Sequence, residues 1–234
     1  MSNDAFDLIR SALRPISAAS VADVGAASGP GRRELLRELI ALLRADDALV
    51  RSMVERSYKH PNGFDRISLF REPDGLEARI HLWERGVPSD EGIHNHAWDF
   101  SSLVLTGALR FQILQQTADG ETYDLYRSGM PRGGRFGDYE FTRLGTTSLG
   151  VVFDGTVSAG SAYHQHRDAY HRVLVSPEQS MTATIVVRGP VRRGFSHVVV
   201  PRGTSMPRTR SMRHLGGEEI IEKLCALLSR LSEE

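Results

Sequence analysis

The stretches that decide the fold class are RISLFR (66–71), ARIHLW (78–83) and SSLVLTGALRFQIL (101–114), in which apolar side chains recur with a period of two. Similar short segments, rich in β-branched residues and separated by Gly, Asp or Pro, continue to about residue 190. Short strands at such spacing are typical of an antiparallel sandwich or barrel. The sequence therefore predicts a mainly β barrel over residues 59–190.

Helical patterns flank this β region on both sides. In GRRELLRELIALLRADDALVRSMVERSY (31–58), apolar residues recur at helical spacing, and Asp46 and Asp47 are expected to divide the stretch into two helices. A shorter helical pattern covers residues 5–16, and a closing helix is predicted over residues 216–234. We expect three segments: N-terminal helices over 1–58, the barrel over 59–190, and a basic loop with the C-terminal helix, packing on the barrel, over 191–234.

Residues 188–214 differ from the rest of the chain because they contain seven arginines and no acid. We interpret this segment as a solvated loop whose charge is balanced by acidic helices elsewhere. Two alternatives are an anion-binding segment and a lid over the barrel mouth.

The overall composition excludes several classes of function. The chain has 29 basic and 29 acidic residues, so its formal net charge is zero, which argues against nucleic acid as a partner. No apolar run is long enough for a membrane span, and no secretory signal is visible, so we expect a cytoplasmic protein. A single cysteine, Cys225, excludes an internal disulfide and a cysteine-based zinc cage. We expect a monomer or homodimer that acts on a small molecule.

The chain has nine histidines, and five of them lie in two short clusters. The first cluster is His94-Asn95-His96, whose two histidines project from the same face of a strand, within reach of one metal ion. The competing interpretation is a chance pair, since this spacing is common. Imidazole suits Fe, Zn, Cu and Ni, so the pair alone does not select the metal.

The second cluster lies in HQHRDAYHRV (164–173) and offers His164, His166 and His171. If a later strand returns one of them beside the first pair, a facial three-nitrogen site results. Such a site leaves coordination positions open for substrate and dioxygen, as non-haem iron oxygenases require. We favour His171 as the third ligand because it opens the strand-like run HRVLVS, while His164 and His166 remain the alternative.

The segment GIHNHAWDFSSLVLTG (92–107) resembles the first motif of the cupin superfamily, in which the two histidines are followed by a spacer and a turn glycine, here Gly107. The position of that motif's usual glutamate holds Phe100, a change characteristic of three-histidine cupins such as the thiol dioxygenases. Residues 64–86 and 162–176 are similar to the segments around the substrate-binding arginine and the third iron ligand of cysteine dioxygenases. The resemblance covers about residues 60–190 and implies a cupin barrel, that is, a double-stranded β-helix or jelly roll.

This resemblance also implies a site and a reaction. Carried over by motif, His94, His96 and His171 match the iron ligands, and Arg66 matches the arginine that binds the substrate carboxylate. The implied activity is an Fe(II)-dependent oxidation of a small carboxylated substrate, plausibly a thiol, by dioxygen, with another divalent metal as the alternative.

The chain also departs from the family. The serine, histidine and tyrosine that follow the third ligand there fall here on about Thr184, Val186 and Arg188. This difference puts cysteine itself in doubt as the substrate.

Two further residues are candidates for catalytic roles, and two further functions remain open. Asp99 is a candidate to orient a ligand histidine, and Tyr163 is a candidate for the site, with packing in the core as its alternative. Arg66 has its own alternative as a surface arginine on a strand. The rival functions are a three-histidine cupin of other chemistry, such as a C–C cleaving dioxygenase or an isomerase, and a non-enzymatic cupin that senses a ligand.

Overall fold

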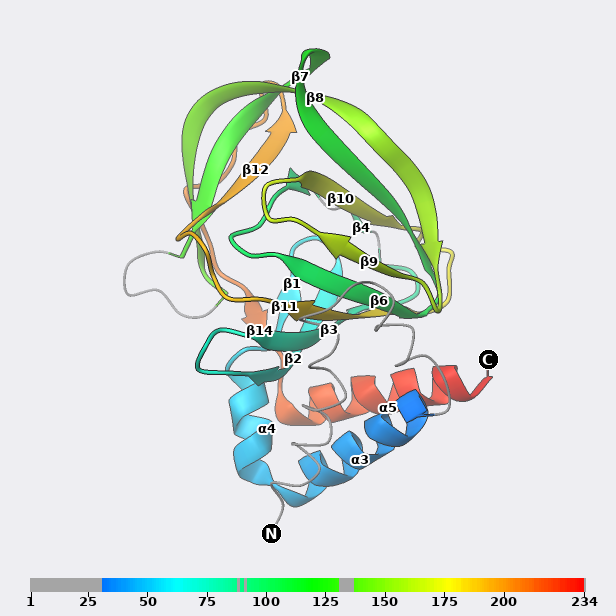
Figure 1. Cartoon of the computed structure of the whole chain (residues 1–234). Coiled ribbons are helices and arrows are strands. Elements are labelled where there is room, and N and C mark those ends of the chain that lie inside the picture. Colours follow the sequence, from blue (N-terminus) through cyan, green and yellow to red (C-terminus); the bar gives the residue numbers. More distant parts are fainter. Residues whose placement is uncertain (1–30, 88, 91, 131–136, 234) are drawn as a thin grey trace.

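The computed structural model describes residues 31–87, 89–90, 92–130 and 137–233. The helix expected over residues 5–16 lies outside these ranges. The described residues form a mainly β protein in which two seven-stranded antiparallel sheets face each other, with helices beneath one of them (Figure 1). None of the described helices is long and apolar enough to cross a membrane.

The sheet beside the helices, which we call the helix-side sheet, has the strand order β14-β1-β2-β3-β11-β6-β9. Its strands are β1 (Tyr58–His60), β2 (Phe64–Arg71), β3 (Glu77–Trp83), β6 (Phe100–Thr106), β9 (Ala162–Gln165), β11 (Thr182–Arg188) and β14 (Arg213–His214).

The opposite sheet, which we call the far sheet, has the order β13-β8-β7-β12-β5-β10-β4, with β7 also pairing with β10. Its strands are β4 (Ser89–Asp90), β5 (Ile93–His94), β7 (Ala108–Gly129), β8 (Tyr139–Ser158), β10 (Tyr170–Val175), β12 (Ser196–Pro201) and β13 (Thr209–Arg210).

The order of the strands identifies the barrel as a jelly roll. The chain passes repeatedly between the sheets, so that β3-β11-β6-β9 in one faces β5-β10-β7-β8 in the other. This arrangement confirms the predicted fold class, a cupin-type double-stranded β-helix with flanking helices. Gly107, the predicted turn glycine, joins β6 to β7 with a φ of 74°, a conformation that favours glycine.

Helices α3 (Gly31–Ala45), α4 (Asp47–Val54) and α5 (Gly217–Glu233) pack on the outer face of the helix-side sheet (Figure 1). The predicted break between the first two is confirmed, because the Asp46 carboxylate caps α4 by accepting from the backbone N–H groups of Ala48 and Leu49, at 2.9 and 3.1 Å. Apolar residues of the helices and of alternate strand positions form one core. Its members include Leu39, Leu43, Ile67, Ala78, Ile80, Leu82, Ala183, Ile220 and Leu224.

The interpretation of residues 188–214 as a solvated loop is wrong for residues 196–201, 209–210 and 213–214, which form strands. Residues 196–201 form β12, which lies between β5 and β7 in the middle of the far sheet, and two shorter strands follow. Several of its arginines are paired: Arg188 with buried Glu77, Arg193 with Asp168 and Arg213 with Glu219. The β-branched run HVVV (197–200) satisfies the requirements of a central strand despite the basic surroundings.

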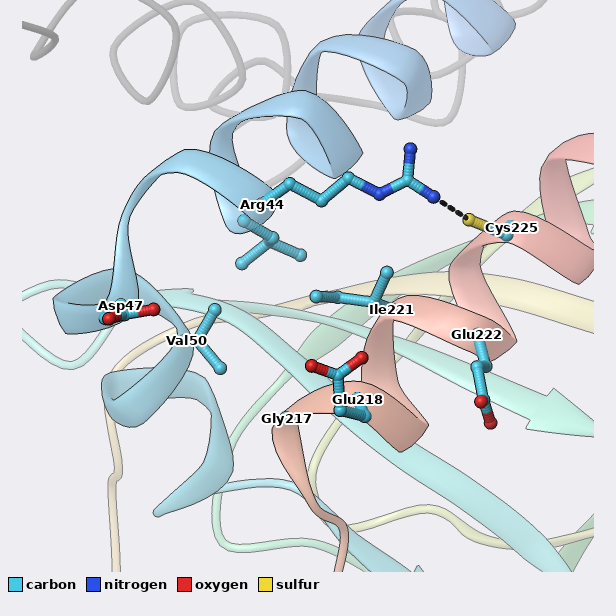
Figure 2. Close-up of a pocket in the computed structure, with 9 residues that line it drawn as sticks. Arg44, Asp47, Val50, Gly217, Glu218, Ile221, Glu222 and Cys225 are labelled. Carbon is cyan, nitrogen blue, oxygen red and sulfur yellow. Dashed lines mark hydrogen bonds between the residues drawn. The ribbon is translucent and has the colours of Figure 1, made fainter.

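A cavity of about 700 Å³ lies between the helices, far from the histidine clusters (Figure 2). Arg44, Asp47, Val50, Glu218 and Cys225 are among its lining residues. Cys225 packs against the apolar core and accepts a hydrogen bond from Arg44 Nη2 at 3.5 Å. Cys225 is therefore a partly buried residue of the helical layer.

Candidate metal centre

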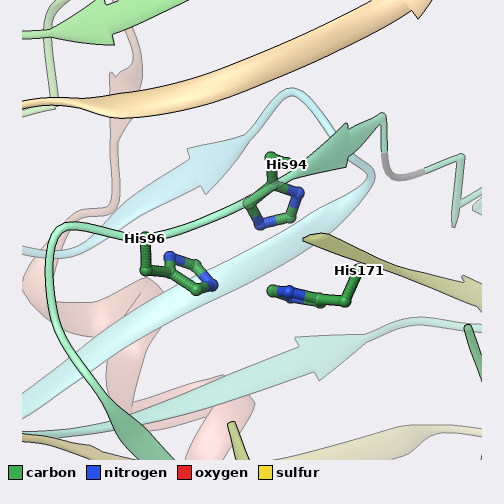
Figure 3. A group of neighbouring side chains, drawn as sticks. All are labelled: His94, His96 and His171. Atoms are coloured by element: carbon green, nitrogen blue, oxygen red, sulfur yellow. The ribbon is translucent and has the colours of Figure 1, made fainter. Parts of the chain in front are cut away.

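Three histidines converge inside the barrel: His94, His96 and His171 (Figure 3). His94 on β5 and His171 on β10 are direct partners in the antiparallel register of the far sheet. His96 follows two residues after His94, and its ring centroid lies 4.9 Å from that of His94 and 5.0 Å from that of His171. One ligand atom from each residue lies within 4.8 Å of the others, so one ion can bind all three.

Asn95, between the two histidines of the first cluster, explains why both reach the same space. Its side chain is buried, and its Oδ1 accepts from the backbone N–H of His197 on β12 at 2.7 Å. Its own backbone N–H donates to the carbonyl of His197 at 3.0 Å. Strand β12 thus fixes the backbone from which both imidazoles project.

The backbone of His96 is held from two sides. Its N–H donates to the carbonyl of Arg167 at 3.1 Å, and its carbonyl accepts from Arg193 Nη2 at 2.7 Å. Arg193 also binds Asp168 at 2.6 Å, so it ties the chain after β5 to the loop between β9 and β10. An arginine of the basic segment therefore supports the position of a candidate ligand.

The electrostatics of the three imidazoles suit metal binding. Burial lowers the pKa of His94, and it lowers the pKa values of His96 and His171 well below the ordinary value, with repulsion from His94 adding to both. Neutral imidazoles are the form that coordinates metals. His94 Nδ1 lies 2.8 Å from the carbonyl of Gly92; donation there leaves Nε2 free to coordinate. The donor set therefore fits a divalent transition metal.

The alternative ligands of the second cluster lie elsewhere. His164 on β9 pairs with Ser101 across the sheet, and its Nδ1 lies 3.1 Å from the Ser101 hydroxyl. His166 is exposed, with its ring nitrogens 3.7 Å from Asp99 and 3.6 Å from Asp168. The structure thus brings His171, rather than His164 or His166, beside His94 and His96.

The three histidines open onto a cavity of about 620 Å³ between the sheets. Its apolar wall includes Phe64, Trp83, Trp98, Phe100 and Tyr163. Its polar wall on the helix-side sheet is formed by alternate residues of β2, β3 and β11, namely Arg66, Arg79, His81, Thr184 and Arg188. The cavity therefore combines a possible metal site with a strongly basic wall.

Two of the three arginines share one carboxylate. Arg66 donates to one oxygen of Glu77 and to the carbonyl of Arg56, and Arg188 Nε donates to the other oxygen of Glu77 at 2.8 Å. Burial alone would raise the pKa of Glu77, but the charges of the neighbouring arginines outweigh it and lower that pKa to about 2. Glu77 is therefore an anion that holds both arginines in place.

Arg79, the third arginine, has a different environment. Its guanidinium lies over the indole of Trp98, at 4.6 Å from the ring centroid, and Nε has no hydrogen-bond partner. Burial and the nearby charge of Arg66 lower the pKa of Arg79 to about 10. The same indole stacks on His96, with ring centroids 4.0 Å apart. Arg79 thus lies one aromatic ring away from the histidine cluster.

The residues predicted for catalysis have different surroundings. Arg66 lies in the cavity wall, as expected of a substrate-binding residue, but its guanidinium already binds Glu77. Tyr163 also lines the cavity, where its ring packs 4.5 Å from that of Phe111. The Asp99 carboxylate accepts from the backbone N–H of Arg167 at 2.7 Å and binds the guanidinium of the same residue. It does not bind a ring nitrogen of His94, His96 or His171.

Glu77, Arg79 and His81 were not predicted as site residues, although the alternation of their strand carries a signal for them. In EARIHLW (77–83), Ala78, Ile80 and Leu82 face the helices, so the residues between them face the barrel. Charged and imidazole groups at alternate positions of a buried strand indicate a polar cavity. His60 and His81, which lie outside the two histidine clusters of the sequence, both line that cavity.

Comparisons with known proteins find similarity at the level of the fold. No protein-family model matches the sequence, and no curated protein matches it. Among solved structures, hydroxypropylphosphonic acid epoxidase from S. wedmorenis is similar over 56% of this chain, at 12% identity and a TM-score of 0.36. A variant of oxalate decarboxylase from Bacillus subtilis is similar over 60%, at 10% identity and a TM-score of 0.36.

KdgF from Halomonas sp. is similar over 57% of this chain and 84% of its own, at 18% identity and a TM-score of 0.33. The chain spans about half the length of the epoxidase (53%) and 29% of the decarboxylase.

Proposed function

We propose that the protein is a non-haem iron enzyme that uses dioxygen to oxidise a small carboxylated thiol. The observation that carries this proposal is the convergence of His94, His96 and His171 on a cavity whose opposite wall is basic. His94, His96 and His171 would hold Fe(II) through their neutral imidazoles, and the bound metal would supply the redox chemistry for the reaction with dioxygen.

The roles of the chain's own residues follow from their placement. The histidines would hold the metal from β5, from β10 and from the residues that follow β5. Asn95 ties this backbone to His197 on β12, and Arg193 binds the carbonyl of His96. The arginines of the helix-side sheet attract an anion, and their planar forks suit a carboxylate. Phe64, Trp98 and Phe100 cover the space between metal and arginines with apolar surface. A small substrate with a carboxylate at one end and a soft donor at the other matches this layout.

Oxygen consumption tests the proposal. Protein loaded with Fe(II) under anaerobic conditions is mixed with small carboxylated thiols of different chain length in oxygenated buffer, and dissolved oxygen and product mass are followed. We expect substrate-dependent uptake and a product heavier by the oxygen consumed. His94→Ala is expected to abolish uptake, whereas His166→Ala, outside the cluster, is the matched control and is expected to retain it. No bound metal and no uptake after loading would overturn the proposal.

A further inference from the structure

Several polar atoms on the inner face of the helix-side sheet lack a hydrogen-bond partner. Arg79 Nε, His81 Nε2 and Thr184 Oγ1 are buried and unpaired. They are neighbours, because His81 and Thr184 are cross-strand partners and Arg79 lies two residues from His81 on β3. All three residues line the cavity that contains the histidine cluster. Buried polar atoms are normally paired, so this group indicates a place where a polar ligand supplies the missing contacts.

The same wall also carries more positive than negative charge. Arg66, Arg79 and Arg188 are at most 7% exposed, and Glu77 is 0% exposed. Three arginines and one glutamate leave two formal positive charges among these residues. Glu77 binds Arg66 and Arg188, whereas among the described residues no carboxylate lies within ion-pair distance of Arg79. Arg79 thus shares the charge of Glu77 with two other arginines and has no ion-pair partner of its own, and an anionic ligand would offset the cost of burying its charge.

We propose that Arg79 binds the carboxylate of the substrate. In the same wall, Arg66 and Arg188 have a structural role, because both are paired with Glu77. This inference rests on the proposed function only in taking its substrate to be the ligand of this cavity. It differs from the assignment that the sequence favours, in which Arg66 has this role. Arg66 is committed to Glu77 and to a backbone carbonyl, while Arg79 lines the cavity with its Nε buried and without a hydrogen-bond partner.

The position of Arg79 also limits the size of the substrate. Trp98 contacts Arg79 on one part of its surface and His96 on another, at 4.6 and 4.0 Å. A ligand that reaches from Arg79 to the histidine cluster therefore spans about one indole ring. This distance fits a carboxylate separated from its second donor by a few carbon atoms.

Calorimetric titration of metal-free protein with malonate, without oxygen, tests this assignment. Arg79→Met is expected to weaken malonate binding roughly 10- to 100-fold, because it removes a charge-assisted pair. Arg79→Lys keeps the charge but loses the fork, so about tenfold weaker binding is expected. Arg37→Met, on the exposed face of α3, is the control and should bind malonate as the unmodified protein does. Sulfate should bind at least about tenfold more weakly than malonate if the fork selects a planar carboxylate.

Thermal unfolding of the ligand-free proteins provides a second readout that a merely structural arginine would not give. Arg79→Met removes a buried positive charge that has no ion-pair partner of its own, so its Tm should rise by a few degrees. Arg188→Met removes a partner of Glu77, so its Tm should fall. Absence of malonate binding, unchanged binding in Arg79→Met, equal affinity for sulfate, or a fall in Tm for both variants would overturn the inference. Because neither measurement uses metal or oxygen, a failed oxidation assay would leave it standing.

Discussion

The two faces of the helix-side sheet are built from the same strands, but they differ in whether their side chains find partners within the protein. On the outer face, Ile67, Ile80 and Leu82 pack against the helices in one apolar core. On the inner face, Arg79, His81 and Thr184 carry polar atoms without partners. The apolar side chains of the outer face thus find their contacts within the protein, whereas these polar atoms of the inner face lack hydrogen-bond partners. Period-two alternation in a buried strand thus separates the side chains that pack with the helices from the side chains that line the cavity.

The largest effect is expected from Glu77→Gln, which breaks the ion-pair cluster on the inner face. Removing the carboxylate charge leaves Arg66 and Arg188 buried without a counter-ion, and such a loss typically costs roughly 3–5 kcal/mol. The free energy of unfolding from urea titration measures it. A loss below about 1 kcal/mol would mean that the cluster does not hold the wall, since even a single neutral hydrogen bond contributes about that much.

A loss of about 3 kcal/mol is expected from Leu82→Ala, which acts on the outer face alone. Leu82 is 0% exposed and belongs to the core under the helices. Because the inner face of β3 is untouched, malonate affinity should stay unchanged while urea stability falls. A parallel loss of malonate affinity would show that the two faces are not independent.

Acid is expected to reduce the stabilisation that Glu77 provides on the inner face. The pKa of Glu77 is lowered from 4.5 to about 2 in the folded protein, so its stabilisation is fully present above about pH 4.5 and is lost as the pH falls towards 2. The shift corresponds to about 3 kcal/mol. Urea unfolding at about pH 5 and about pH 3 should show a decrease that is smaller in Glu77→Gln. Identical pH dependence in the two proteins would contradict this account.

The smallest effect is expected from Thr184→Val. The Thr184 hydroxyl has no partner, so its removal should leave stability unchanged or raise it by up to about 1 kcal/mol. Thr182→Val, two residues earlier on β11, is the matched control: its hydroxyl donates to Gln179 Oε1 at 3.2 Å, and its loss should cost about 1 kcal/mol. Equal losses in both variants, measured by urea unfolding, would argue against an unsatisfied inner face.

Much of the barrel and of the histidine cluster was predictable from the sequence, because both depend on local patterns. Alternation predicted the strands, and the spacing of His94 and His96 placed both on one side of the chain. The association of His171 with them depends on the register between β5 and β10, which strand-like flanking residues favoured without determining it.

The arrangement of the arginines was not predictable in the same way. Nothing in the linear sequence links Glu77 to Arg188, which lies 111 residues further along the chain. The resemblance drew attention to Arg66, and only the cross-strand contacts distinguish its paired guanidinium from the unpaired one of Arg79. Likewise, the arginines around HVVV obscured a strand that belongs in the middle of the far sheet.

Metal content tests the central claim most directly, since everything proposed for the cavity begins with the three histidines. Elemental analysis after reconstitution with Fe(II) and removal of free metal should give about one ion per chain for the unmodified protein and for His164→Ala. His171→Ala should retain only background metal, because loss of a ligand should exceed the roughly 10- to 100-fold effect of losing a group behind one. Full metal content in His171→Ala, or none in the unmodified protein, would contradict the account.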